Sequence, residues 1–272
     1  MKIGHIEFQI IKMLFYLYNL YLRVNKELVY LWSKKFSVSL KVIYVAYVAQ
    51  VIFRNVAYYR HEQRETLKDI GFEIISEMDK NDKWIAEIMF NVLHIYLAVF
   101  LVIPWFLPYG HSNHVMGVKM AERFLNCMVV GHTLRFLTYT STSLPGPAIH
   151  CRLGADSKTL IFEDIFTRKA SGDDPNCGDL IFSGHMFQEI MISILVTFNV
   201  KKVISNKFID IIIIFTVWSI TIVQAPFIVA ARNHYTVDIV VASYLAPLVW
   251  IAFEYFETKP NNNDPILSFD AL

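Results

Sequence analysis

The amino-acid sequence predicts an all-α, polytopic membrane protein: a helix bundle of about six transmembrane helices with an N-terminal amphipathic helix. Of the 272 residues, 55% are hydrophobic and 18% are charged, with a mean hydropathy of +0.40, whereas a soluble domain carries about 25% charged residues. The chain also contains 21 Phe and 14 Tyr, more apolar surface than one water-soluble core of this size can hide. The same composition excludes an intrinsically disordered chain and a disulfide-dense secreted module.

Each predicted span is a stretch of roughly 20 mostly apolar residues, the length that crosses a bilayer as a helix. The clearest is 211–231, which contains no charged residue. The other five are 40–59, 85–107, 124–144, 186–200 and 237–253. Each of these five contains at least one ionisable residue, and such a residue within lipid usually faces the bundle interior or a polar cavity.

Residues 1–38 are expected to form a cytosolic amphipathic helix in the membrane interface, because Ile10, Ile11 and Phe15 are interleaved with Lys12 and Asn19. A short, poor span is the alternative. The six spans then form a membrane domain over residues 39–256, and residues 257–272 form a short polar cytosolic tail.

Positive charge predicts which side of the membrane each loop occupies. Lysine and arginine recur in residues 1–38 and in the loop near Lys201, Lys202 and Lys207, with Lys119 and Arg123 in the remaining loop on that side. The positive-inside rule assigns these segments to the cytosol, so the loops over 60–84 and 145–182 are exoplasmic. The net charge of +1, with basic residues spread along the chain, gives no indication of a nucleic-acid partner.

Two short segments contain residues suited to catalysis. His234 and Asp238 are four residues apart, so on a helix they share one face, and the carboxylate can fix the imidazole tautomer. That arrangement suits a histidine nucleophile. Ser183 and Gly184 come directly before His185 at a predicted helix start, where backbone N–H groups favour a bound anion. Singly, each pattern also occurs on ordinary helix surfaces; together, at the same end of two spans, they indicate an active site.

These segments resemble the sphingomyelin synthase family of ceramide phosphotransferases, within the lipid phosphatase/phosphotransferase superfamily. The resemblance rests on Ser183-Gly184-His185 and His234-x-x-x-Asp238 in their longer forms, CGDLIFSGH and HYTVDIVVASY. Residues 134–147 are similar to the family's Arg-x-x-Thr-x-x-x-Thr-x-Leu-Pro-x-Pro stretch. The family's proline-rich loop survives only as Leu67-Lys68-Asp69, and Arg232-Asn233 stands where sphingomyelin synthases tend to have an acidic residue.

The resemblance implies a two-step transfer of phosphocholine or phosphoethanolamine from a glycerophospholipid donor to a ceramide acceptor. His234 attacks phosphorus and forms a phosphohistidine, while His185 exchanges protons with the oxygens that leave and attack. Asp179 would orient His185 or help tune its basicity, and Ser183, Gly184 and Arg135 would support the phosphate. No metal or other cofactor is needed, and homo-oligomerisation is left open. The family implies a Golgi or plasma-membrane enzyme with a lumenal or exoplasmic active site.

Several alternatives remain open at this stage. A lipid phosphatase or phospholipase C-like hydrolase would replace ceramide by water, and an inactive sphingolipid sensor or scaffold would need no chemistry. The Lys-x6-Arg-Pro cluster of phosphomonoester phosphatases is absent from the sequence. Arg135 could meet a phosphate or a carboxylate, the latter as a buried ion pair with Glu87 or Glu189. Arg232 could reach the phosphate or, as we expect, extend toward the headgroups.

The three cysteines give no metal-ligand spacing. Cys151 and Cys177 lie in one exoplasmic loop, where a disulfide is permitted, although two free thiols are a comparable alternative. His94 and His132 fall within spans, where we expect them to be satisfied inside the bundle.

Overall fold

The computed structural model describes residues 2–79, 82–107, 117–154, 162, 164–167, 177–204 and 206–258. Within these residues the chain is helical and contains no strand, which confirms the predicted all-α class. Most of the tail predicted over 257–272 lies outside the described residues, as does much of the loop predicted over 145–182.

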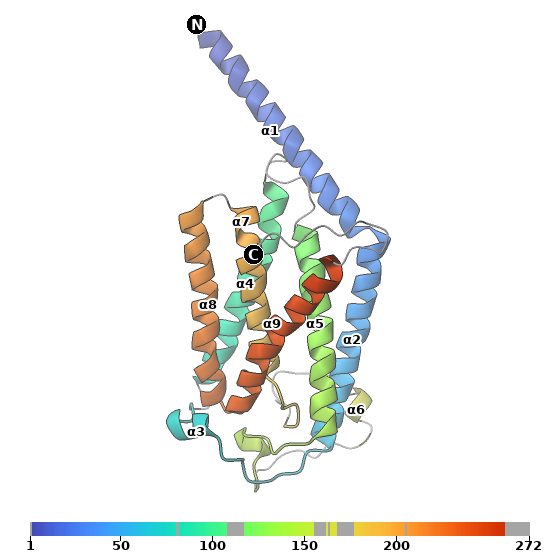
Figure 1. Cartoon of the computed structure of the whole chain (residues 1–272), viewed down its shortest axis with the longest axis vertical. Coiled ribbons are helices and arrows are strands. Elements are labelled where there is room, and N and C mark those ends of the chain that lie inside the picture. Colours follow the sequence, from blue (N-terminus) through green and yellow to red (C-terminus); the bar gives the residue numbers. More distant parts are fainter. Residues whose placement is uncertain are drawn as a thin grey trace.

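Six long helices form the bundle in Figure 1 and correspond to the six predicted spans. They are α2 (Lys34–Tyr59), α4 (Trp84–Phe106), α5 (Gly117–Ser141), α7 (Gly184–Val203), α8 (Lys207–Ala230) and α9 (Thr236–Thr258). Four of them, α2, α4, α8 and α9, are long and apolar enough to cross a membrane. Helices α5 and α7 carry more polar residues and fall outside that set, so the count of six spans remains a prediction.

Helix α1 (Lys2–Leu31) extends beyond the bundle at the end opposite α3 (Ile70–Ile74), as Figure 1 shows. Its C-terminal half is attached to the bundle through buried polar contacts. Glu27 accepts hydrogen bonds from the backbone N–H groups of Gly117 and Val118, at 3.1 and 3.0 Å, which caps the start of α5. The next helix begins at Lys34, so the predicted boundary between residues 38 and 39 falls inside α2.

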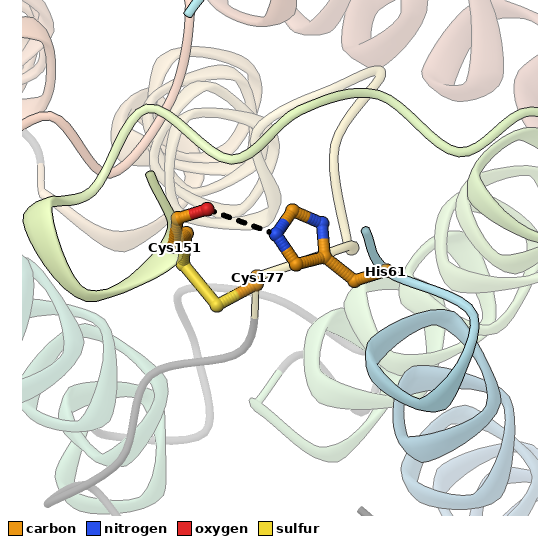
Figure 2. Close-up of side chains that lie close together, drawn as sticks. All are labelled: His61, Cys151 and Cys177. Atoms are coloured by element: carbon orange, nitrogen blue, oxygen red, sulfur yellow. Dashed lines mark hydrogen bonds between the residues drawn. A yellow bond between two sulfur atoms is a disulfide. The ribbon is translucent and has the colours of Figure 1, made fainter. Parts of the chain in front are cut away.

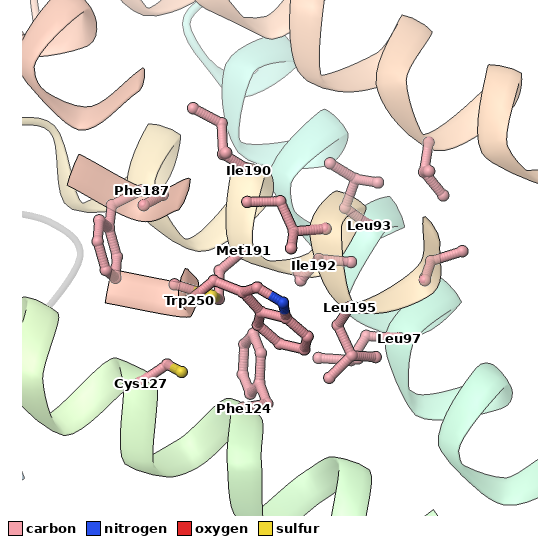
Figure 3. Packing of buried hydrophobic residues seen from close by; sticks show 14 of the residues in the cluster. Leu93, Leu97, Phe124, Cys127, Phe187, Ile190, Met191, Ile192, Leu195 and Trp250 are labelled. Atoms are coloured by element: carbon pink, nitrogen blue, oxygen red, sulfur yellow. The ribbon is translucent and has the colours of Figure 1, made fainter. Parts of the chain in front are cut away.

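Helix α7 lies at the centre of the core, because it packs against α4, α5, α8 and α9. Met191 and Leu195 of α7 are fully buried, and Trp250 of α9 is 1% exposed beside them. Figure 3 shows this packing together with Leu97 of α4 and Phe124 of α5. Because α7 has apolar neighbours on every side, its position in the bundle is fixed. Its first residue, Gly184, is therefore also fixed in position, next to the candidate site.

All the short elements described lie at the end of the bundle away from α1 (Figure 1). They are α3, the 3-10 turn η3 (Ile149–Cys151) and α6 (Asp164–Thr167). Helices α2, α5 and α8 end there, while α4, α7 and α9 begin there. The antiparallel order of the bundle therefore brings the two histidine motifs to one end.

Candidate active site

The turn between α8 and α9 presents His234 with its ring oriented by Asp238. Nδ1 of His234 lies 3.0 Å from Oδ2 of Asp238, and the two side chains are 6% and 0% exposed. The same carboxylate oxygen accepts the backbone N–H of Tyr235 at 3.1 Å. Because Nδ1 donates to the carboxylate, the lone pair of a neutral ring is on Nε2. The predicted His–Asp pair therefore exists with the geometry that a histidine nucleophile requires.

The loop before α7 is hydrogen-bonded directly to this pair. The backbone N–H of Ile181 donates to Oδ1 of Asp238 at 2.9 Å, and that of Ser183 donates to the carbonyl of Asp238 at 3.1 Å. Ile181 has a positive φ of 60°, an uncommon conformation for a β-branched residue. Ser183 is fully buried and caps α7, its Oγ accepting the N–H of Met186. The two motifs thus form one connected unit.

His185, in the first turn of α7, has a carboxylate neighbour from α4. Its Nε2 lies 3.8 Å from Oε1 of Glu87, and both side chains are partly exposed, at 35% and 56%. The ring also makes an edge contact with Phe90, with centroids 4.4 Å apart. Of the two histidines, His185 is therefore the more exposed one, which suits a group that exchanges protons with a substrate.

Arg135 supports the loop that carries His185. Its Nε donates to the carbonyl of Phe182, and its Nη2 donates to both the carbonyl and the carboxylate of Asp179, each at 3.0 Å. The guanidinium lies against Gly184, where an added Cβ would come within 3.2 to 3.3 Å of it. A side chain at this position would therefore require the guanidinium to shift by a few tenths of an ångström.

These contacts correct two expectations. Asp179 is predicted to orient His185, but its carboxylate forms an ion pair with Arg135, and the carboxylate nearest to His185 comes from Glu87. Arg135 meets a carboxylate, as one alternative had it, although the partner is neither Glu87 nor Glu189. In the polar run after Arg135, Thr140 and Ser141 bond to carbonyls of their own helix, whereas Thr138 also donates to the carbonyl of Ile181 in the loop before α7, at 2.6 Å.

Asp69 is a structural residue of the site that no catalytic motif in the sequence includes. One carboxylate caps two helices: Oδ1 accepts the N–H of Gly71 in α3, and Oδ2 accepts the N–H of Thr236 in α9, both at 2.9 Å. The hydroxyl of Thr236 also donates to Oδ1 at 2.6 Å. Asp69 therefore fixes the start of the helix that carries Asp238. The only signal for it in the sequence is the Leu67-Lys68-Asp69 remnant.

Tyr235 connects three segments beside His234. Its hydroxyl accepts the N–H of Leu67 at 3.1 Å and donates to the carbonyl of Pro145 at 2.8 Å. Burial raises the pKa of this phenol, with the nearby carboxylates of Asp238 and Asp69 acting in the same direction. Tyr235 therefore remains a neutral structural hydrogen-bond donor.

Arg232 does not extend toward headgroups as expected, nor is it placed as an exposed phosphate ligand. It is 7% exposed, lies 4.0 Å from the ring centroid of Phe72 and donates to the carbonyl of Ile75 at 3.1 Å. Glu77 lies 3.9 Å from its Nε and also pairs with Arg152 at 2.9 Å. Burial lowers the pKa of Arg232, and Glu77 opposes that shift. Through these contacts Arg232 connects the segment after α3 to the turn before His234.

A disulfide joins Cys151 to Cys177, which settles the alternative that the sequence left open. Figure 2 shows His61 beside it, with Nε2 of His61 3.1 Å from the carbonyl oxygen of Cys151. These three side chains are close enough to hold a metal ion. The two sulfur atoms are bonded to each other, however, so in this form they cannot act as thiolate ligands.

The arrangement provides a buried, oriented imidazole, a second and more open imidazole with a carboxylate neighbour, and a guanidinium behind the connecting loop. This set can transfer a group through a covalent histidine intermediate, with the second histidine acting as acid and base.

Comparisons with known proteins found similar sequences over the segment that contains both histidine motifs. The PAP2 superfamily C-terminal domain matches residues 176–256, which include both histidine motifs. The chain is 29% identical over 244 residues to a phosphatidylinositol:ceramide inositolphosphotransferase of Oryza sativa subsp. indica, covering 83% of this chain and 72% of the rice protein.

Two further relatives are matched over a smaller share of their own length. Phosphatidylinositol:ceramide inositolphosphotransferase 2 of Arabidopsis thaliana is 31% identical over 196 residues, which cover 71% of this chain and 61% of the plant protein. Sphingomyelin synthase-related 1 of Caenorhabditis elegans is 26% identical over 185 residues, 64% of this chain and 35% of that protein.

Proposed function

The chain belongs to the sphingomyelin synthase-like family of the PAP2 superfamily, and on that premise we propose that it transfers a phospho-headgroup from a glycerophospholipid to ceramide. The observation that carries the proposal is the His234–Asp238 pair, bonded to the loop that presents His185. The remaining product is diacylglycerol.

In the first half-reaction the Nε2 lone pair of His234 forms a P–N bond as the bond between phosphorus and the glycerol oxygen breaks. His185, in its protonated form, gives its proton to that leaving oxygen. Asp238 stabilises the positive charge that develops on His234, and the Ile181 N–H keeps the carboxylate in place. The headgroup is then held as a phosphohistidine.

In the second half-reaction the primary hydroxyl of ceramide attacks phosphorus and loses its proton to His185. The P–N bond breaks and its electron pair returns to Nε2 of His234. Both histidines regain their starting protonation states, so the cycle balances. Glu87 stabilises the imidazolium form of His185 when the proton is on it. No step requires a metal ion or another cofactor.

Phosphoinositol is the headgroup that we propose to test first, ahead of the phosphocholine and phosphoethanolamine implied by the family resemblance. The rice and Arabidopsis relatives carry phosphatidylinositol in their names. Arg232-Asn233 also stands where sphingomyelin synthases tend to have an acidic residue. A carboxylate there would suit a choline or ethanolamine cation, whereas a neutral polyol does not need one.

We further propose that the helices from α2 to α9 form the catalytic domain and that both chain termini are cytosolic. The site then faces the lumen of the Golgi or the exoplasmic side of the plasma membrane. Two observations support this orientation. The Cys151–Cys177 disulfide lies at the site end, and disulfides persist in oxidising compartments. Several lysines lie at the opposite end, Lys34, Lys119, Lys201 and Lys207 among them.

The experiment reconstitutes the purified chain in liposomes with fluorescent ceramide and one donor at a time: phosphatidylinositol, phosphatidylcholine or phosphatidylethanolamine. We expect a new fluorescent phosphosphingolipid, formed in EDTA and lost in His234→Ala. Full product formation by that variant would refute the phosphohistidine. Release of diacylglycerol and a free headgroup phosphate, without a new sphingolipid, would establish the hydrolase instead. No turnover with any donor, by folded wild-type protein, would support the sensor alternative.

A further inference from the structure

A second set of polar side chains lies one level deeper in the bundle than the site. Helices α4, α5 and α7 each contribute one site residue near the site end and a second polar residue farther from it. The deeper residues are His94, His132 and Gln188. Oε1 of Gln188 lies 3.1 Å from Nε2 of His94, and its Nε2 lies 3.5 Å from Nε2 of His132. All three side chains are partly buried. We call them the inner polar cluster.

The hydrogen bonds define the orientation of the central amide. Nδ1 of His94 lies 2.9 Å from the carbonyl oxygen of Phe90, so Nδ1 carries the hydrogen. A neutral His94 ring then accepts at Nε2, so the amino group of Gln188 faces His94 and the amide oxygen faces His132, with the two amide positions given above exchanged. Gln188 keeps a second N–H and a second oxygen lone pair beyond these two contacts.

The depth of the inner polar cluster follows from helix geometry. Gln188 is three residues beyond His185 and His132 is three residues before Arg135, which at 1.5 Å per residue places both about 4.5 Å deeper along their helices. His94 is seven residues beyond Glu87, which is about 10 Å. The inner polar cluster therefore lies on the membrane side of the groups that act on phosphorus.

The acceptor lipid carries polar groups at a matching depth. In ceramide the amide and the secondary hydroxyl sit on the two carbons that follow the one bearing the reactive hydroxyl, so they lie a few ångströms further into the membrane. Diacylglycerol, the product of the first half-reaction, has an equivalent primary hydroxyl but esters in place of these donors. A transferase that accepted diacylglycerol would only reverse its own first step.

We propose that the inner polar cluster is the acceptor subsite, which binds the amide N–H and the secondary hydroxyl of ceramide and so selects ceramide over diacylglycerol. Within lipid an unpaired polar group raises the free energy, so hydrogen bonds between the inner polar cluster and ceramide stabilise both the protein and the lipid. A site built to hydrogen-bond a substrate N–H or O–H discriminates strongly against an analogue that lacks it. This inference rests on the proposed transfer to ceramide.

The first test leaves the protein unchanged and varies the acceptor. Wild-type protein in liposomes receives ceramide, N-methyl ceramide, 3-deoxyceramide or diacylglycerol, each with its primary hydroxyl intact. We expect kcat/KM to fall about tenfold for each single deletion and further for diacylglycerol, mainly through KM. Analogues that react as well as ceramide would overturn the subsite and leave the proposed function standing.

The second test changes the cluster. Gln188→Leu removes the amide at similar volume, and Ile95→Ala serves as the control because Ile95 adjoins His94 yet is 65% exposed, on the outside of the bundle. We expect Gln188→Leu to raise KM for ceramide about tenfold, with a smaller change for N-methyl ceramide. The control should preserve the wild-type ratio of ceramide to N-methyl ceramide turnover. A purely structural role for Gln188 would lower folded yield and leave the ratio of ceramide to N-methyl ceramide turnover unchanged, which refutes the subsite.

The two proposals fail in different ways. If wild-type protein transfers no headgroup to any lipid acceptor while it hydrolyses the donor, the proposed function fails and the subsite fails with it. If transfer to ceramide proceeds but neither the analogues nor Gln188→Leu alter acceptor preference, only the subsite fails.

Discussion

The backbone N–H of Ile181 donates to Oδ1 of Asp238 at 2.9 Å, across 57 residues of sequence. The carboxylate that orients His234 therefore also holds the loop that leads into His185. One side chain coordinates the two halves of the site, so a change in its charge or hydrogen-bonding pattern affects both histidines.

Asp238→Asn should abolish most activity while the protein remains folded. The amide oxygen can still accept from Ile181, but its amino group would then face two existing donors, Nδ1 of His234 and the N–H of Tyr235. The tautomer of His234 is then no longer fixed with its lone pair on Nε2, and we expect the rate of transfer to ceramide to fall by about 100-fold or more.

The matched control for this variant is Asp210→Asn. Asp210 is also a buried aspartate, 4% exposed, but it lies in the first turn of α8 at the opposite end of the bundle. Initial rates and thermal unfolding in detergent should show an activity loss in Asp238→Asn alone. Equal rates for the two variants would contradict the assigned role of Asp238.

Asp69→Ala should impair both stability and turnover, because this carboxylate caps α3 and the start of α9 together. Loss of a helix cap costs about 1 kcal/mol. Asn206→Ala offers the comparison, since Asn206 caps α8 by accepting from Phe208 and Ile209 at the other end of the bundle. We expect both variants to unfold at lower temperature and only Asp69→Ala to lose kcat. If both variants lose kcat to the same extent, reduced stability alone explains the effect of Asp69→Ala, and the assigned role at the site is wrong.

Local patterns in the sequence were sufficient for the helices and the two histidine motifs. Apolar stretches of span length predict helices wherever they occur, and His234 and Asp238 are close enough in sequence to share a face. The carboxylates that come from other helices could not be found this way. Glu87 reaches His185 only because α4 packs against α7. Asp69 reaches Thr236 only because the chain just before α3 lies beside the start of α9, 167 residues further along.

Arg232 shows why a single charged residue next to a span is hard to interpret. A cation at a span end usually extends to the headgroups. Here Phe72 and the carbonyl of Ile75 cover it, and they belong to a five-residue helix and the turn after it, too short for hydrophobic periodicity to reveal.

Reduction of the disulfide should lower activity more than it lowers the amount of folded bundle. Cys151 follows Pro145, which accepts from Tyr235, and Cys177 precedes the loop that bonds to Asp238. Cys151→Ser should destabilise the protein by about 2–4 kcal/mol and reduce kcat. Cys127→Ser replaces the buried free cysteine of α5 and leaves the bridge intact, so we expect it to retain wild-type kcat and to lose activity on reduction as the wild type does.

Stability should fall as the pH is lowered through the range in which His61 titrates. Burial is the main cause that lowers the pKa of His61 from its ordinary value of 6.5, and it outweighs the hydrogen bond to Cys151, which acts in the opposite direction. Below pH 6.5 the unfolded chain therefore binds a proton that the folded chain resists, so the unfolded state gains. Above that pH both states are neutral at this position and no dependence remains.

The measurement compares thermal unfolding at pH 7.5 and pH 5.5 for the wild type and His61→Gln. Glutamine retains an N–H group that can reach the carbonyl of Cys151 but does not titrate. We expect the melting temperature of the wild type to drop more on acidification than that of the variant, while the two agree more closely at pH 7.5. An equal drop in both proteins would show that other groups control the acid response. A larger drop in His61→Gln would mean that protonated His61 stabilises the fold, the reverse of the sign derived from its burial.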